Sequence, residues 1–260
     1  MKEIIKKWYN ILNFPREYDG AFEKLLSETE LTPSTVDEYK SANDYKKDLL
    51  MSLYFCEATA ENAEKQGLPY DVLLDSLSDI VTLTRAYYEE RNDIGLYSYG
   101  WTVLAHKLYL HKLGRLEFMP SAGKMEVHIP RGEPFDPEAC IESFKKSVDF
   151  FEKYYPDFEY DTYYTDSWLL DDETLVQFLN KDSNILHFAR FFDKQKKTES
   201  DDAIHFVFGY SAERGNLSKY AIKNSFMRKL YDYVMNGGKL YRVYGEIKKD
   251  DIVSGKLENC

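Results

Sequence analysis

The stretch Tyr163-Tyr-Thr-Asp-Ser-Trp-Leu-Leu-Asp171, followed by Asp182-Ser-Asn-Ile-Leu-His-Phe-Ala-Arg-Phe-Phe192, decides the fold of this chain. Aromatic and polar residues alternate up to Trp168, which predicts a strand, and residues 173–179 predict a short helix. The second run is apolar on both faces, so we expect a second strand there. Strand, short helix and strand, all rich in aromatic residues, predict the centre of a mixed sheet covered on both sides.

Length and composition indicate a soluble globular protein of two domains. The chain has 260 residues, of which 43% are hydrophobic and 30% charged, enough for a substantial core. Its net charge of −11 disfavours nucleic acids and anionic membranes as partners, because like charges repel. No apolar run is long enough to span a bilayer and the N-terminus lacks a signal-peptide core, so we expect a cytoplasmic protein.

Cysteines and histidines give no sign of a disulfide framework or a metal site. The three cysteines (Cys56, Cys140 and Cys260) are widely spaced, and Cys140 fits the apolar side of a helix as a small buried residue. None of the five histidines lies four residues from another, so we expect no metal cofactor.

The periodicity of the chain changes near residue 113. Before that point the pattern is helical throughout, which predicts an all-helical domain over residues 1–112 with helices at 4–12, 21–27, 45–66, 69–88 and from Trp101 to Gly114. After it, alternation predicts strands at 115–118, 124–129, 203–208 and 239–247 and helices at 136–155 and 218–236. Residues 194–202 read as a hairpin or loop. We therefore expect a second domain over 113–250, followed by a loose tail over 251–260. Helices followed by a mixed α and β domain predict an α+β protein.

Several polar residues are candidates for chemistry, each with a structural alternative. His128 ends a strand before a glycine-containing loop, where catalytic groups often lie, although a structural histidine is the commoner case. Asp166, Asp171 and the following Asp172 could supply carboxylates for acid–base work, but acids that end a strand are more often turn formers and caps. Ser167 and Trp168 could line a pocket, or Trp168 could belong to the core.

A basic segment lies within the acidic chain. Between Ala212 and Lys249 we count nine basic residues against three acidic ones. It begins at a strand–loop–helix junction, where Arg214-Gly215 precedes a helix expected to start at Ser218. Free N–H groups at a helix N-terminus attract phosphate, so a phosphate-bearing ligand fits this segment, with Lys219 reaching toward it. A solvated basic helix face explains the same charges.

These residues carry a resemblance to a known family. The sequence resembles the bacterial acyltransferase-domain-containing proteins, which pair a helical N-acyltransferase N-terminal domain with a C-terminal domain like the GNAT fold. The resemblance covers nearly the whole chain and rests on the segments Leu113–Phe118, Val127–Pro130, Ser167–Asp171, Asp182–Ile185 and Gly237–Gly238.

The resemblance implies acyl transfer from coenzyme A to an amine. GNAT enzymes hold the pyrophosphate of coenzyme A on a (Q/R)xxGx(G/A) loop that opens a helix. The nearest match here is Arg214-Gly-Asn-Leu-Ser218, which keeps an arginine and one glycine but has Leu217 and Lys219 where a small residue is expected. The resemblance therefore implies a cofactor site at Arg214, Gly215, Ser218 and Lys219, with acetyl-CoA or another acyl-CoA as co-substrate.

Two functions fit the sequence at this point. The first is an acyl-CoA-dependent N-acyltransferase that acts on a small-molecule amine. Because the family fixes no general base, His128, Asp166 and Asp171 are the candidates, with Tyr163 as acid to the leaving thiolate and Ser167 and Trp168 in the substrate pocket. The second is a GNAT-like binding or regulatory module without catalysis, which the altered phosphate loop favours.

Overall fold

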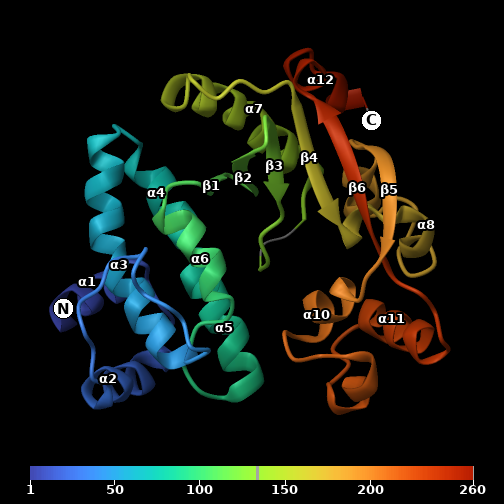
Figure 1. Ribbon diagram of the computed structural model, residues 1–260. Coiled ribbons are helices and arrows are strands. Elements are labelled where there is room, and N and C mark those ends of the chain that lie inside the picture. The colour runs from blue at the N-terminus through green and yellow to red at the C-terminus, as the bar shows by residue number, and fades with distance from the viewer. Residues whose placement is uncertain (133–134, 260) are drawn as a thin grey trace. The chain divides into compact units, whose positions relative to one another are not determined.

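A computed structural model describes residues 1–132 and 135–259 of the chain (Figure 1). The chain divides into two compact units. The first comprises residues 1–113 with 117–119 and 130–132, and the second comprises 114–116, 120–129 and the described residues from 135 onward. Across the described ranges, no helix has both the length and the apolar character that crossing a membrane requires.

The first unit is built from helices, as predicted. Its helices are α1 (Lys2–Ile11), α2 (Asp19–Glu28), α3 (Tyr45–Lys65), α4 (Tyr70–Leu77), α5 (Asp79–Arg91) and α6 (Tyr99–His106), with a 3-10 turn at Arg16–Tyr18. The single helix expected over 69–88 is wrong in one respect, because it divides at Ser78. The Ser78 hydroxyl donates to the carbonyl of Asp75 at 2.6 Å, a local bond that competes with helix continuation. The helix expected to reach Gly114 ends at His106, and Leu108 follows with φ of 56°.

A buried histidine joins two helices of this unit. The His106 Nε2 atom lies 2.8 Å from Ser52 Oγ, and Nδ1 lies 3.0 Å from Thr59 Oγ1, both hydroxyls coming from α3. Burial lowers the pKa of His106 to about 3. The ring is therefore neutral in the folded protein, and its two nitrogens are satisfied by hydroxyl groups.

We expect the stability of the protein to fall as the pH drops below 6.5. In the unfolded chain His106 takes up a proton near its ordinary pKa of 6.5, whereas the folded form resists it down to about 3. Each pH unit in this window favours unfolding by about 1.4 kcal/mol, or about 2 kcal/mol between pH 6.5 and 5. Urea unfolding at several pH values measures the slope.

The variant His106→Gln tests the assignment. It should be less stable at pH 7, and the free energy of unfolding should depend on pH less steeply, by about one proton. The buried His111, whose pKa burial lowers to about 4, should still contribute to that pH dependence in the variant. An unchanged slope in the variant would contradict the role of His106.

A mixed sheet lies mainly in the second unit, as predicted, with its residues 111–113 and 117–119 in the first. Among the described residues, six strands form one sheet in the order β1-β2-β3-β4-β6-β5. Their bounds are β1 (His111–Leu113), β2 (Leu116–Ser121), β3 (Lys124–His128), β4 (Thr162–Ser167), β5 (Asp193–Glu199) and β6 (Tyr241–Lys248). β3 and β4 are parallel and are joined by α7 (Pro137–Tyr154), whereas β6 runs antiparallel to both β4 and β5. The helix start predicted at Asp136-Pro137 is confirmed, because the Asp136 side chain accepts a hydrogen bond from the Glu138 N–H.

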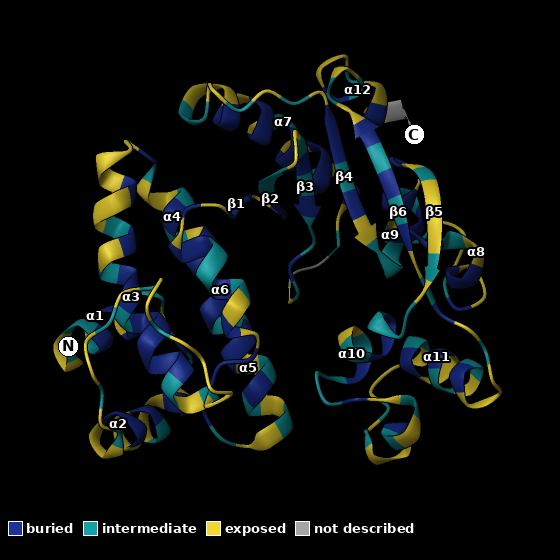
Figure 2. Cartoon of the chain, in the orientation of Figure 1, coloured by how far each residue is buried: buried dark blue, intermediate teal, exposed yellow. Residues whose placement is uncertain are grey.

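One face of the sheet packs against α7. Tyr163 of β4 is fully buried, and its ring meets Phe144 of α7 edge-on at 5.4 Å. Beside it, Gly245 of β6 lacks the Cβ atom that would lie 2.8 Å from Leu170 and 2.9 Å from Phe192. The absence of that side chain lets both residues close over the strand. Figure 2 shows buried, dark blue stretches along β4 and α7.

The elements after β4 differ most from the sequence predictions. They are the 3-10 turn Trp168–Leu170, α8 (Asp172–Leu175), α9 (Asn184–Ala189), α10 (Asp202–Phe208), the 3-10 helix η3 (Arg214–Lys219) and α11 (Ser225–Met235). The strands predicted within 182–192 and at 203–208 are wrong, because both segments are helices. The loop predicted at 194–202 is instead β5, and the helix predicted from Ser218 begins at Ser225.

These helices enclose a core of their own within the second unit. Its fully or nearly buried side chains include Leu186, Ile204, Leu217 and Leu230, and Trp168 packs against it from the end of β4. Cys140, on α7, is fully buried as predicted, and Cys56 and Cys140 are both free thiols. Cys260 lies outside the described residues.

The C-terminal segment packs against the unit. The described part of the loose tail predicted over 251–260 belongs to α12 (Lys249–Val253) and to a 3-10 turn at Lys256–Asn259. Ile252 is 2% exposed and Leu257 is 4% exposed. Glu258 pairs with Lys145 of α7 at 2.7 Å, which ties the segment to the helix.

We expect Ile252→Ala to destabilise the protein by about 2–4 kcal/mol, because it removes buried methyl groups and leaves a cavity. The matched control is the next residue, Val253, which is 68% exposed. Val253→Ala should change the free energy of unfolding by less than about 0.5 kcal/mol. Equal effects of the two substitutions, measured by denaturant unfolding, would show that the segment is not packed.

Candidate functional site

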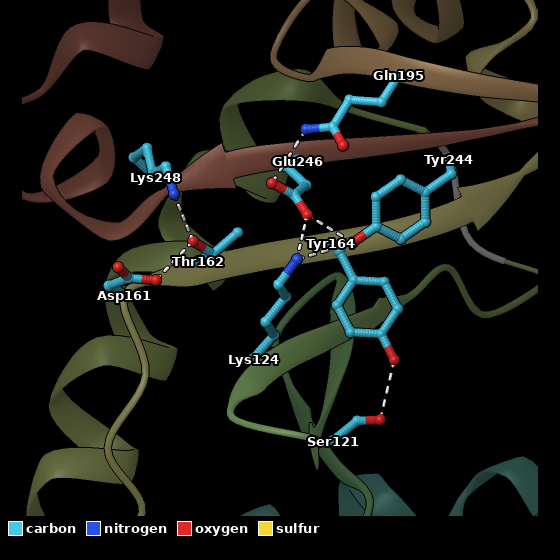
Figure 3. A network of polar contacts seen from close by, with 9 residues as sticks. All are labelled: Ser121, Lys124, Asp161, Thr162, Tyr164, Gln195, Tyr244, Glu246 and Lys248. Carbon is cyan, nitrogen blue, oxygen red and sulfur yellow. Dashed lines mark hydrogen bonds and ion pairs between the residues drawn. The ribbon is translucent and has the colours of Figure 1, made fainter.

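The sheet face opposite α7 carries a set of polar side chains, which we call the polar face. Successive residues of a strand point to opposite faces, so Tyr164 lies on the other side of β4 from Tyr163. Strand pairing places Tyr164 opposite Glu126 of β3 and Glu246 of β6. The polar face consists of Ser121, Lys124, Glu126, His128, Tyr164, Asp166, Gln195, Tyr244 and Glu246, most of them drawn in Figure 3.

Glu246 is the most heavily hydrogen-bonded group of the polar face. Its carboxylate accepts from Lys124 Nζ, from the Tyr244 hydroxyl at 2.6 Å and from Gln195 Nε2 at 3.0 Å (Figure 3). The hydrogen bond from Lys124, followed by that from Tyr244, lowers the pKa of Glu246 to about 2. Glu246 is therefore ionised at any working pH, and its pairing with Lys124 raises the pKa of that lysine in turn.

Tyr164 lies between this cluster and β3. Its ring stacks on that of Tyr244, with centroids 5.5 Å apart and an interplanar angle of 29°. Its hydroxyl lies 2.8 Å from Glu126 Oε2 and 2.9 Å from Ser121 Oγ. Burial raises the pKa of Tyr164. The phenol therefore keeps its proton at neutral pH and can act as a donor.

Two sequence-predicted bases, His128 and Asp166, lie on the polar face. They follow Glu126 and Tyr164 by two residues on parallel strands, so they share a face near the carboxyl ends of β3 and β4. His128 Nε2 lies 3.6 Å from Glu126 Oε1, and burial lowers the pKa of His128 to about 4. Asp166 pairs with Arg242 of β6 at 3.2 Å. A neutral imidazole and a partly exposed carboxylate thus stand where the strands end.

The structure places Tyr163 and Asp171 away from the polar face. The Tyr163 hydroxyl is hydrogen-bonded to Ser147 of α7 at 2.8 Å and to Tyr160 at 2.9 Å, and burial raises its pKa. Asp171 is buried before α8 and accepts a 2.6 Å hydrogen bond from Lys197 of β5. Both side chains are therefore engaged in packing interactions inside the second unit.

Ser167 and Trp168 mark the transition from β4 to the helices that follow it. The Ser167 hydroxyl accepts a hydrogen bond from the Leu169 N–H at 3.2 Å and so caps the 3-10 turn. Trp168 packs against the core formed by α8 to α11. Each side chain thus has a structural contact at the end of β4, two residues or fewer from Asp166.

The predicted phosphate-binding residues all lie in η3. Arg214 Nε donates to both carboxylate oxygens of Asp201 at 2.9 Å, and Nη1 donates to the Gly238 carbonyl at 2.8 Å. Gly215 faces open space, and Lys219 is exposed. Ser218 is not a helix cap, because the cap of α11 is Asn224, whose side chain accepts from the Met227 N–H.

Sequence reasoning missed Lys124, Tyr164 and Glu246. A signal for them was present: polar residues occupy every second position of β4 (Thr162, Tyr164, Asp166) and of β6 (Tyr244, Glu246, Lys248). That alternation indicates a polar sheet face. In the described part of the chain, no three His, Cys, Asp or Glu residues are grouped so that they could hold a metal ion.

Three solved structures resemble this fold. A mutant acyltransferase in complex with octanoyl-CoA matches with a TM-score of 0.78 and 20% identity, over 95% of this chain and 88% of that one. An acyltransferase in complex with decanoyl-CoA and teicoplanin matches with a TM-score of 0.71 and 24% identity, over 80% and 67%. A third, with decanoyl-CoA, matches with a TM-score of 0.70 and 19% identity, over 88% and 75%. No curated protein sequence matches the chain.

A protein-family model matches the C-terminal half of the chain. The GNAT-like C-terminal domain matches residues 110–247, a range that contains β1 to β5 and all of β6 except Lys248. The fold predicted from the sequence, with helices followed by a GNAT-like mixed-sheet domain, is thus confirmed. The chain belongs to the family of proteins with a GNAT-like C-terminal domain.

Proposed function

We propose that this protein transfers an acyl group from an acyl-CoA to an amine of a small-molecule acceptor, and that the reaction takes place on the polar face. One observation carries the proposal: two candidate bases stand near the carboxyl ends of a parallel strand pair and share a face with a protonated tyrosine two residues earlier in β4. In open α/β sheets, ligands bind beyond those ends. The structures of similar fold hold octanoyl-CoA or decanoyl-CoA, which supports an acyl-CoA as the co-substrate.

The reaction needs two proton transfers. The acceptor nitrogen attacks the thioester carbonyl carbon and forms the C–N bond, the C–S bond breaks, and coenzyme A leaves as a thiolate. The nitrogen must lose one proton and the thiolate must gain one, so no other reactant is required. We assign the base to His128 or Asp166. A neutral imidazole accepts a proton directly, and the low pKa of His128 keeps it neutral throughout the physiological range.

We assign the proton donor to Tyr164. Its raised pKa keeps the hydroxyl protonated, and it already donates to an anionic oxygen, Glu126 Oε2. A developing thiolate or carbonyl oxyanion would replace that acceptor. Tyr163, the donor expected from the sequence, is the competing assignment, and substitution of the two neighbouring tyrosines separates them.

For the phosphates of coenzyme A, we retain the segment Arg214–Lys219. Its support is the local excess of basic residues, the open backbone at Gly215 and the exposed Lys219. Arg214 would have to give up Asp201 for a phosphate oxygen, whereas Lys219 could reach one from the surface. We extend the proposal to the cytoplasm, the location expected from the sequence, because the protein must work where its acyl-CoA co-substrate is present.

Calorimetric titration tests the proposal. Purified protein is titrated with acetyl-CoA, octanoyl-CoA, coenzyme A and adenosine 3′,5′-bisphosphate. We expect micromolar binding of an acyl-CoA, weakened about tenfold in Lys219→Ala because one phosphate contact is lost. The control is Lys239→Ala, another exposed lysine of the basic segment, which pairs with Glu199. Absence of binding at millimolar ligand by folded protein would overturn the acyltransferase assignment.

The alternative is a GNAT-like binding module without catalysis. The engagement of Arg214 by Asp201 and Gly238 favours it, because this arginine is occupied in the ligand-free protein. A result in which coenzyme A fails to bind while the polar face still binds a small amine would select this function.

A further inference from the structure

The β2–β3 hairpin delivers two side chains to the polar face at its tip. β2 ends at Ser121 and β3 begins at Lys124. The two residues between them, Ala122 and Gly123, have φ values of 49° and 76°, which is the geometry of a tight two-residue hairpin turn. Ser121 and Lys124 are therefore fixed relative to each other. Ser121 contacts the Tyr164 hydroxyl, and Lys124 contacts Glu246 and Tyr244 (Figure 3).

Lys124 reaches across β4 to make these contacts. The strand order is β3-β4-β6, so Lys124 and Glu246 stand on strands that are two steps apart, about 10 Å between backbones. Only long side chains close such a gap. Glu246 is paired with Tyr164, and the ion pair therefore passes over β4 directly beside that tyrosine.

Two of the three contacts described for the Tyr164 side chain are linked to this ion pair, and the third is the hydrogen bond to Glu126 of β3. Tyr244, which stacks on the Tyr164 ring, is held through its hydroxyl by Glu246 and by Lys124 at 3.2 Å. Ser121, which contacts the Tyr164 hydroxyl, belongs to the hairpin that Lys124 anchors. Thus one ion pair fixes a partner of the ring and a partner of the hydroxyl.

We propose that Lys124 and Glu246 are positioning residues that set the orientation of the Tyr164 side chain. The catalytic consequence of this orientation rests on the proposed function, in which Tyr164 is the proton donor. Neither residue need touch the substrate. The ion pair joins strands on either side of β4, and so holds the tyrosine between them in one orientation before the acyl donor arrives.

Two substitutions isolate the ion pair from the packing around it. Lys124→Met keeps most of the side-chain length and removes the ammonium group. Glu246→Gln keeps the shape and an acceptor for the Tyr244 hydroxyl but removes the charge. The control is Lys145→Met, which breaks another ion pair of the same unit, between Lys145 of α7 and Glu258.

The first measurement is independent of activity. Tyr164 is replaced by 3-fluorotyrosine, and its ¹⁹F resonance is recorded in the wild type and the three variants without ligand. We expect a shifted or broadened resonance in Lys124→Met and Glu246→Gln, and the wild-type resonance in Lys145→Met. A resonance unchanged by all three substitutions overturns the proposal, whether or not the protein is an enzyme.

The second measurement connects the geometry to the reaction. In acyl transfer, kcat should fall roughly ten- to a hundredfold in Lys124→Met and Glu246→Gln, while KM for the acyl-CoA stays within about twofold, because a misplaced donor affects the chemical step. A shifted resonance with unchanged kcat would overturn the positioning role. Failure of the wild type to bind acyl-CoA would instead overturn the proposed function, and the resonance would still report on the ion pair.

Discussion

Tyr164→Phe should lower kcat for acyl transfer by roughly 10²–10³-fold and leave KM for the acyl-CoA nearly unchanged. The substitution removes one hydroxyl, which lies 2.8 Å from Glu126 and has a raised pKa, and it leaves the ring stacked on Tyr244. Proton donation by a positioned side chain contributes about this factor, and its loss affects the transition state more than substrate binding. Steady-state kinetics with octanoyl-CoA and a thiol-reactive dye measure both constants.

The neighbouring tyrosine supplies the matched control. Tyr163→Phe also removes one hydroxyl, but that hydroxyl is hydrogen-bonded to Ser147 and Tyr160 on the α7 side of the sheet. We expect nearly full activity and a loss of about 1–3 kcal/mol in the free energy of unfolding, because buried partners lose a hydrogen bond. The reverse result, with Tyr163→Phe inactive and Tyr164→Phe active, would restore the donor expected from the sequence.

Removal of the base should have an effect of similar size. His128→Asn and Asp166→Asn are compared, and we expect kcat/KM to fall roughly 10²–10⁴-fold in the variant that lacks the base. If His128 is that base, its own protonation lowers the wild-type rate only as the pH approaches 4, and any loss of rate at higher pH comes from protonation of the acceptor amine. The rate of Asp166→Asn would then follow the same profile.

Asp171, the third base expected from the sequence, behaves differently in this scheme. Asp171→Asn replaces a buried carboxylate that accepts a 2.6 Å hydrogen bond from Lys197, so we expect lower stability with activity retained. Thermal unfolding and activity at 25 °C separate the two effects. Full activity in all three variants would show that none of His128, Asp166 and Asp171 is the general base.

The sequence predicted the framework of the fold because its signals are strong there. The helices α1 to α3 have apolar stripes, and β3 and β6 alternate between buried and more exposed residues. Segments 184–189 and 202–208 were misread as strands because short apolar runs carry both periods equally well. The caps could have decided the first case, since Ser183 accepts a hydrogen bond from the Leu186 N–H.

Only part of the candidate site could be predicted from the sequence, because the site depends on which strands pair. His128 and Asp166 could be named because each stands near a strand end. Tyr164 and Glu246 are 82 positions apart in the chain, and only the register between β4 and β6 makes them neighbours. A single sequence contains the alternation of each strand but no information on which strands pair. The choice between Tyr163 and Tyr164 required the knowledge of which face packs on α7.

β5 has a consequence for the behaviour of the protein at high concentration. It lies at the end of the strand order, and Lys194, Lys196 and Lys197 stand along its seven residues. An edge strand offers backbone hydrogen-bonding groups to any other edge, including that of a second copy, and like charges on both copies oppose such pairing. Lys194 and Lys197 are ion-paired with Asp172 and with Asp171 and Glu173, so solubility should depend chiefly on Lys196, and its acetylation or a high salt concentration should favour aggregation through this edge.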